Sequence, residues 1–192
     1  MKVLFRILFA FVLTTLPSCA FYHLQTPQTV RPGKVSIGTG GTALFDDLQV
    51  APGAWMRIGL TPRIDAGLHI LGLGVKIDGK YMFNDYLAVG LGGGYGKVFA
   101  YTIDGDQASI SGFEGSIYTG YPTKYLTPYG VVRFTGLPED NWDILPVVSA
   151  VGGVRLGPLD IFSLYAEIGG LFLLKEGYSS GLIGGAGITI GY

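Results

Sequence analysis

Apolar and small residues alternate along much of this chain, most clearly between residues 87 and 95. Leu87, Val89, Leu91 and Tyr95 share one face there, and the positions just after Leu87, Val89 and Leu91 and just before Tyr95 hold only alanine or glycine. Because side chains on a β-strand point alternately to opposite faces, this pattern predicts a strand with one apolar face and one nearly bare face.

A two-residue period or a β-rich composition recurs in ten segments. Their typical length is close to the roughly 9 to 11 residues that a tilted strand needs to cross a bilayer. The predicted strands cover residues 33–43, 50–60, 64–70, 74–83, 86–100, 108–121, 125–135, 146–157, 161–172 and 181–191.

The connections between these segments fall into two classes that alternate along the chain. Short turns at one end and longer loops at the other are typical of outer-membrane barrels, which keep both termini on the short-turn side. Leu71-Gly72-Leu73 makes a poor turn, so a barrel of eight strands is the alternative to one of ten. The short connections are 61–63, 84–85, 122–124 and 158–160, and the mostly longer ones are 44–49, 71–73, 101–107, 136–145 and 173–180.

Composition favours a barrel in a membrane over a barrel in water. Only 14% of the 192 residues are charged, whereas a soluble domain carries about 25%. Beyond the N-terminus, no segment approaches the roughly 20 uninterrupted apolar residues of a membrane helix. A soluble barrel would also need a polar outer face, but the face opposite the apolar one is largely glycine, alanine and serine. The sequence therefore predicts an all-β, antiparallel, up-and-down transmembrane β-barrel of about ten strands over residues 33–192.

The N-terminus has the layout of a secretory signal. Lys2 and Arg6 precede a short apolar core over residues 7–13, too short for a membrane-spanning helix. We expect residues 1–18 to be a signal peptide that is removed from the mature chain.

Residues 16–19, Leu-Pro-Ser-Cys, resemble the lipobox of bacterial lipoproteins, in which a cysteine receives covalent lipid after cleavage. The resemblance implies lipid on Cys19 and, with Ala20 in place of an aspartate after it, an outer-membrane location with the anchor on the periplasmic side. Residues 19–32 lack periodicity and contain Pro27 and Pro32, so they are expected to form a tether. An ordinary signal peptide with an incidental cysteine is the alternative.

Residues 182–192 alternate and end on Tyr192, which resembles the C-terminal signal that the barrel-assembly machinery of the outer membrane reads. Aromatic residues also gather near the predicted strand ends, where interfacial girdles form in membrane barrels. Those beside the short turns are Tyr81, Phe83, Tyr86, Tyr121, Tyr125 and Tyr129, and those near the longer loops are Phe45, Phe99, Tyr101, Trp142, Phe172 and Tyr178.

With the apolar face turned outward, most charged residues of the strands point into the lumen or lie at its mouth. A barrel of this size is mostly filled by side chains, and unpaired charges there would be costly. We therefore expect a structural network of ion pairs, with a selective pore as the alternative. Its members are Arg57, Arg63, Asp65, His69, Lys76, Asp78, Lys80, Glu114, Arg133, Arg155 and Glu167.

Acidic residues dominate the loops assigned to the outside. Acidic loops are more often only solvated, and we expect that here. The alternative is that these carboxylates hold divalent cations that bridge to anionic headgroups. This acidic rim consists of Asp46, Asp47, Asp104, Asp106, Glu139, Asp140, Asp143 and Glu176.

The sequence offers little catalytic chemistry. Its two histidines are His23, in the tether, and His69, which points into the lumen. We expect no metal, and no cofactor apart from the lipid. The net charge of −1 argues against nucleic acid as a partner, which leaves membrane lipid and the assembly machinery. The sequence thus favours a non-catalytic barrel with a structural or surface-interaction role, with a small-solute channel and a lipid-modifying enzyme as alternatives.

Overall fold

The computed structural model describes residues 24–45, 49–71, 74–99, 107–138, 144–158, 161–174 and 180–191. These residues form ten strands that follow one another along the chain. The strands are β1 (Val35–Leu44), β2 (Gln49–Thr61), β3 (Ile64–Leu71), β4 (Gly74–Asn84), β5 (Leu87–Phe99), β6 (Gln107–Gly120), β7 (Leu126–Pro138), β8 (Ile144–Leu156), β9 (Phe162–Leu173) and β10 (Gly181–Gly191).

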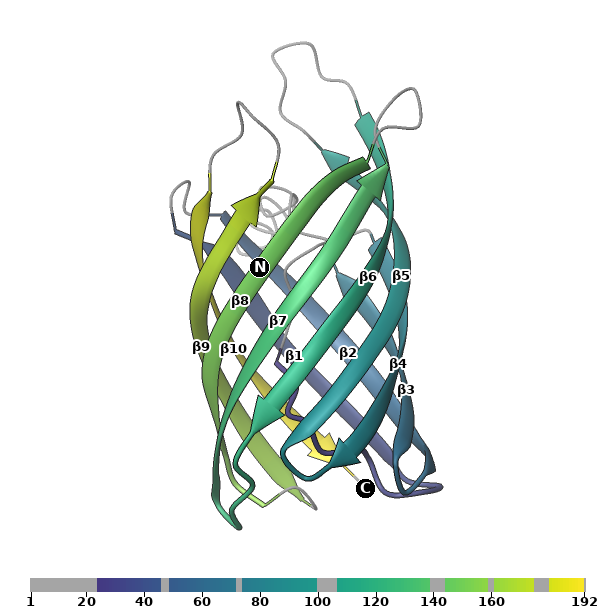
Figure 1. Cartoon of the computed structure of the whole chain (residues 1–192), viewed down its shortest axis with the longest axis vertical. Coiled ribbons are helices and arrows are strands. Elements are labelled where there is room, and N and C mark those ends of the chain that lie inside the picture. Colours follow the sequence, from purple (N-terminus) through teal and green to yellow (C-terminus); the bar gives the residue numbers. More distant parts are fainter. Residues whose placement is uncertain are drawn as a thin grey trace, which may run out of the picture.

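The ten strands close into a single barrel (Figure 1). Each strand pairs antiparallel with its neighbours in the chain, and β1 pairs with β10 from Ser36↔Gly191 to Leu44↔Ile183. Closure leaves no free sheet edge, as a barrel in lipid requires. The predicted closed antiparallel barrel of about ten strands is confirmed, and the eight-stranded alternative is excluded because β3 and β4 are separate, paired strands.

We call the end of the barrel with the β2–β3, β4–β5, β6–β7 and β8–β9 connections the short-turn end. β1 begins and β10 ends there, since Ser36 pairs with Gly191. In the β4–β5 turn, the side-chain oxygen of Asn84 accepts a hydrogen bond from the Tyr86 amide at 2.9 Å, which is the local turn chemistry that favours asparagine. In the described part of the chain, no helix is long and apolar enough to span a membrane.

Apolar side chains face outward from all ten strands. They include Ile77, Leu91 and Ile190, which are 63%, 74% and 63% exposed. The opposite face lines the lumen, where large side chains lie against glycine. A Cβ added to Gly90 would lie 3.0 Å from Cε2 of Tyr118, and one added to Gly153 would lie 2.8 Å from the Tyr129 ring. The glycines of the inner face therefore leave room that these large side chains fill.

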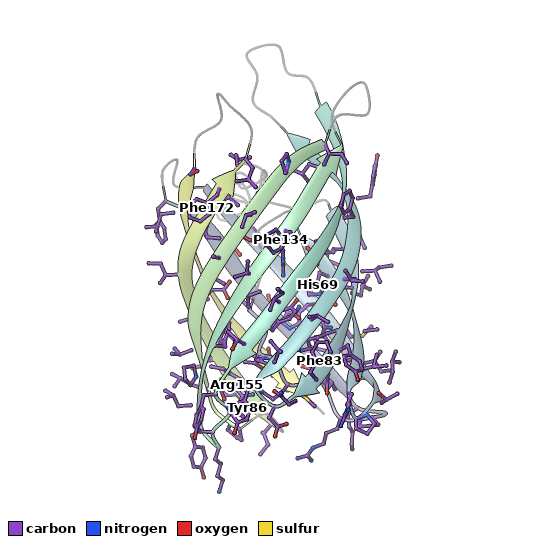
Figure 2. All side chains as sticks on the ribbon, in the orientation of Figure 1. His69, Phe83, Tyr86, Phe134, Arg155 and Phe172 are labelled. Atoms are coloured by element: carbon purple, nitrogen blue, oxygen red, sulfur yellow. The ribbon has the colours of Figure 1, made fainter. Side chains whose placement is uncertain are left out.

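The aromatic side chains with described positions agree with two outer bands, with one correction. Phe83 and Tyr86 lie outside the wall near the short-turn end, and Phe172 lies near the other end (Figure 2). Tyr129, predicted to belong to the outer band, instead points into the lumen and is buried. It alternates with the outward Pro128 and Gly130 on β7, so its strand position decides its face.

Candidate functional site in the barrel lumen

All charged residues in the strands whose side chains are described point into the lumen, and none points outward. This is the reverse of a soluble domain, where charges face water. Figure 2 labels two of the inward group, His69 and Arg155. The buried lumen group is Arg57, Asp65, His69, Lys76, Asp78, Lys80, Glu114, Arg133, Arg155 and Glu167.

Arg57 joins two carboxylates at the centre of this group. Its Nε and Nη2 donate to Oδ1 of Asp65 at 3.2 and 2.5 Å, and its Nη1 donates to Oδ1 of Asp78 at 2.6 Å. Asp78 also lies 2.8 Å from Nε2 of His69, and Asp65 lies 3.6 Å from Nζ of Lys80. Such charge-assisted, multidentate contacts are the strong class of hydrogen bond.

The network continues through Lys76 to a third carboxylate. Lys76 Nζ lies 3.8 Å from Asp78 and donates to Glu114 Oε1 at 3.0 Å, and Arg133 lies 3.5 Å from the other Glu114 oxygen. Lys76 is on β4 and Glu114 on β6, so the pair reaches across β5. The β5 positions opposite them are Gly94 and Gly92, which leave the necessary room.

The remaining predicted network members are Arg155, Glu167 and Arg63. Arg155 is buried and donates through Nη2 to Oγ1 of Thr127 at 2.6 Å. Glu167 accepts a hydrogen bond from the Tyr129 hydroxyl at 2.9 Å. Arg63 is exposed in the β2–β3 turn, at the short-turn end, and does not join the buried group.

The other predicted site residues lie outside the described residues. These are Cys19, with the signal peptide, and all eight members of the acidic rim: Asp46, Asp47, Asp104, Asp106, Glu139, Asp140, Asp143 and Glu176. Among the described residues, no three histidine, cysteine, aspartate or glutamate side chains are grouped so that they could hold a metal ion. Lipidation of Cys19 therefore stays a prediction, and cation binding at the rim stays an alternative to simple solvation.

Residues 24–30 lie inside the lumen, a feature that the sequence analysis missed. We call them the lumen segment. Leu24, Gln25, Thr26 and Val30 are all buried. After Val30 the chain leaves the lumen beside β2, where the Gly33 amide donates to the Gly59 carbonyl at 2.8 Å. The tether was predicted from missing periodicity, and a segment without periodicity carries no local signal of what it packs against.

The wall makes room for the lumen segment at three glycines. A Cβ on Gly187 would lie 2.7 Å from Cδ1 of Leu24, and one on Gly120 would lie 3.1 Å from Cδ of Pro27. A Cβ on Gly59 would overlap the carbonyl oxygens of Val30 and Arg31. The glycines come from β2, β6 and β10, so the fit is formed by the assembled barrel.

His69 contacts acidic, amide and guanidinium groups. Its Nε2 lies 2.8 Å from Asp78, 3.4 Å from Nε2 of Gln25 and 3.5 Å from Nη1 of Arg57. A hydrolytic triad needs a histidine within hydrogen-bond reach of a nucleophilic hydroxyl. Asp78 supplies the orienting carboxylate of such a site, but the described partners of His69 do not include a hydroxyl.

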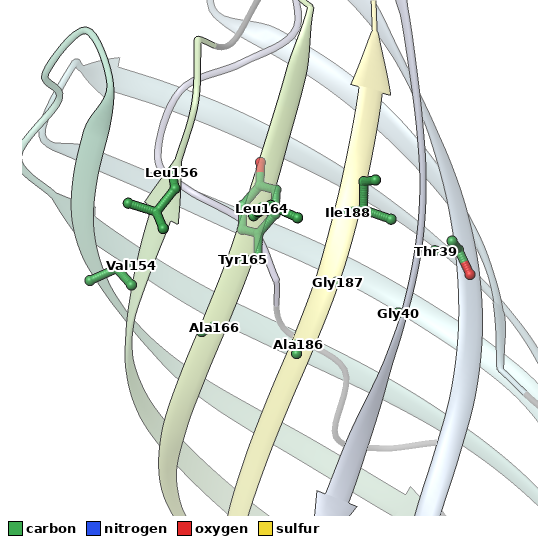
Figure 3. Close-up of a pocket in the computed structure, with 10 residues that line it drawn as sticks. All are labelled: Thr39, Gly40, Val154, Leu156, Leu164, Tyr165, Ala166, Ala186, Gly187 and Ile188. Atoms are coloured by element: carbon green, nitrogen blue, oxygen red, sulfur yellow. The ribbon is translucent and has the colours of Figure 1, made fainter.

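The described outer wall has an apolar hollow of about 600 Å³ over β8, β9, β10 and β1. Figure 3 shows Leu156 and Leu164 beside the small side chains of Ala166 and Ala186. Small residues there bring the surface closer to the backbone. The hollow contains no charged residue among its lining side chains, in keeping with the rest of the outer wall.

No protein-family model matches the sequence, and no curated protein sequence matches it. Among solved structures, the chain is similar to the N-terminal β-barrel domain of Pseudomonas aeruginosa OprF, with a TM-score of 0.45 and 13% sequence identity. That alignment covers 84% of this chain and 98% of the OprF domain. A structure from the de novo design of transmembrane β-barrels gives a TM-score of 0.42 and 15% identity, covering 86% of this chain and all of the designed one.

Proposed function

We propose that this protein is a non-catalytic outer-membrane β-barrel whose lumen is closed by paired charges and by its own N-terminal segment. Its role in this proposal is structural, with the acidic outer loops available for surface interactions. One observation carries the proposal: every described charge of the strands is inside, and every strand turns apolar side chains outward. Lipid is the surrounding medium that favours this arrangement.

The ion pairs support a closed lumen over a conducting one. Lys76, Asp78, Glu114 and Arg133 come from β4, β6 and β7 and meet in the interior. A side-chain network in so narrow a barrel occupies the space that a channel would need for water. We accordingly expect the purified protein to show no steady conductance in planar bilayers.

The proposal includes lipid on Cys19 and removal of residues 1–18. It is supported by the Leu-Pro-Ser-Cys sequence directly after a short apolar core. The short-turn end, where β1 begins, would then face the periplasm.

The decisive experiment tests both whether the protein is in the outer membrane and whether its barrel is closed. Membranes of expressing cells are separated by density, and the outer-membrane fraction is extracted in mild detergent and run with and without boiling. A closed barrel resists unfolding by the electrophoresis detergent until it is boiled, so its mobility shifts. Recovery in the outer membrane with a boiling-dependent shift supports the proposal. A water-soluble protein without the shift would refute it.

A further inference from the structure

A cavity of about 120 Å³ lies between the lumen segment and the barrel wall. One water molecule needs at least roughly 10–15 Å³ of such space, so the cavity has room for several. Apolar cavities stay dry, whereas roomy polar ones take up water. Most of the lining side chains are polar or charged, and they include Gln25, Thr26, Gln28, Ser36, Asp65 and Thr189.

Three lining residues carry a buried side-chain oxygen that has no hydrogen-bond partner among the described residues. These atoms are Oε1 of Gln25, Oε1 of Gln28 and Oγ1 of Thr189. The side-chain nitrogen of Gln28 donates to the Asp85 carbonyl at 2.6 Å, which leaves the Gln28 oxygen as an acceptor. Gln25 and Thr189 are each only 4% exposed. Buried oxygens of this kind are normally bonded to protein or to ordered water.

The buried charged groups beside the cavity already have protein partners. Asp65 accepts hydrogen bonds from Arg57, and Nζ of Lys80 donates to the carbonyl oxygens of Thr26 and Gln28 at 3.0 and 2.7 Å. The three oxygens without a partner are neutral, and the two amide oxygens can only accept hydrogen bonds. Water both donates and accepts hydrogen bonds, so it matches all three oxygens better than an ion does.

The cavity runs from the short-turn end of the barrel to an apolar layer in the lumen. Near the short-turn end its lining includes Thr29, which is half-buried, and Arg31, which is exposed. Its deeply buried lining residues include Leu24, Trp55 and Tyr165, which belong to one hydrophobic cluster. The polar part of the cavity therefore lies on the short-turn side of this cluster.

We propose that this cavity is a binding site for ordered water molecules that bridge the lumen segment to the barrel wall. Water bound there completes the hydrogen bonds of Gln25, Gln28 and Thr189. It also lies beside the Arg57–Asp65 pair, where water lowers the cost of taking two charges out of bulk solvent. The inference rests on the proposed closed barrel and goes beyond it, because the short-turn part of the closed lumen is hydrated and not dry.

Thr189→Val tests whether the Thr189 hydroxyl is bonded to water, because valine keeps the shape and removes the hydroxyl. A hydroxyl bonded to water loses those bonds in the variant, so the unfolding equilibrium constant in lipid vesicles should rise roughly fivefold. A hydroxyl without any partner costs stability, and its removal should leave the barrel equally or more stable. Wild-type or higher stability of Thr189→Val in urea unfolding would overturn the inference.

Thr42→Val is the matched control for this substitution. Thr42 is also 4% exposed, and its Oγ1 also has no partner among the described residues. Thr42 does not line the cavity, so Thr42→Val should not lower the stability of the barrel. An equal loss of stability in the two variants would overturn the inference, because the effect would then not belong to the cavity.

A high-resolution crystal structure of the full-length protein tests the site directly and needs no variant. We expect water within hydrogen-bond distance of Thr189 Oγ1 and of Oε1 of Gln25 or Gln28. A cavity that is empty, or filled by protein side chains, would refute the site. A wild-type barrel that shifts on boiling while these tests fail refutes the water site alone, whereas absence of that shift refutes the proposed function.

Discussion

Arg57→Met tests whether the buried ion network stabilises the barrel. The substitution keeps an unbranched apolar stem but removes every contact of the guanidinium with Asp65 and Asp78. Both carboxylates then remain in the lumen, where Arg57 itself is only 4% exposed. We expect the variant to be less stable because its two buried carboxylates have lost their contacts with the guanidinium.

The expected loss of unfolding free energy depends on the contacts that Asp65 and Asp78 keep in the variant. Removing one partner of a buried ion pair typically costs about 3–5 kcal/mol. Asp65 retains Lys80 at 3.6 Å and the Val30 amide, and Asp78 retains His69 at 2.8 Å. Because these contacts remain, we expect a loss near the lower end of that range. The free energy of unfolding should fall by about 3 kcal/mol, which changes the unfolding equilibrium constant roughly a hundredfold.

The assay is urea unfolding of the barrel in lipid vesicles, followed by the mobility of unboiled samples. Arg63→Met is the control, because Arg63 is an exposed arginine in the β2–β3 turn. It should change the unfolding midpoint little. The double variant Arg57→Met/Asp65→Asn should lose less stability than the two single variants added together, since each single change leaves a charge that the double change removes. A midpoint for Arg57→Met equal to that of the wild type or of Arg63→Met would refute the reasoning.

Three further predictions address the outer wall, the lumen segment and the anchor. Ile77 is 63% exposed in the middle of β4, so Ile77→Arg should lower the free energy of unfolding in vesicles by about 2–4 kcal/mol. Ile64→Arg, near a strand end, should lower it by only about 0–1 kcal/mol. Equal losses in urea unfolding would argue against a membrane around β4. Gly59→Ala should push residues 30–31 away from β2 and make the lumen segment easier to cleave by protease. Gly79→Ala should leave cleavage unchanged, because a Cβ there meets open space. Equal cleavage of the two variants would contradict the close packing of residues 30–31 against Gly59. Cys19→Ser should abolish labelling by a palmitate analogue and leave the boiling-dependent shift intact, and persistent labelling in the variant would refute Cys19 as the lipid site.

The sequence by itself determined the strands and the face to which most side chains turn. The two-residue period is a local property, so Ile77 outside and Asp78 inside follow from neighbouring positions on β4. The same period places Arg57, His69 and Glu114 in the lumen without any knowledge of which strands pair. Tyr129 lies near a turn, as residues of the outer aromatic bands do, but its register on β7 turns it into the lumen.

Only the tertiary structure decided which inward groups meet. Lys76 reaches Glu114 because strand pairing places β4 and β6 on either side of β5, whose Gly92 and Gly94 leave room, and no local pattern contains this relation. The position of residues 24–30 was equally hidden, because the groups that hold this segment, such as His69, Lys80 and Glu167, come from strands far apart in the sequence. Side-chain periodicity reports which way a strand faces, whereas contacts to a backbone inside the lumen depend on register, closure and the space left at glycine.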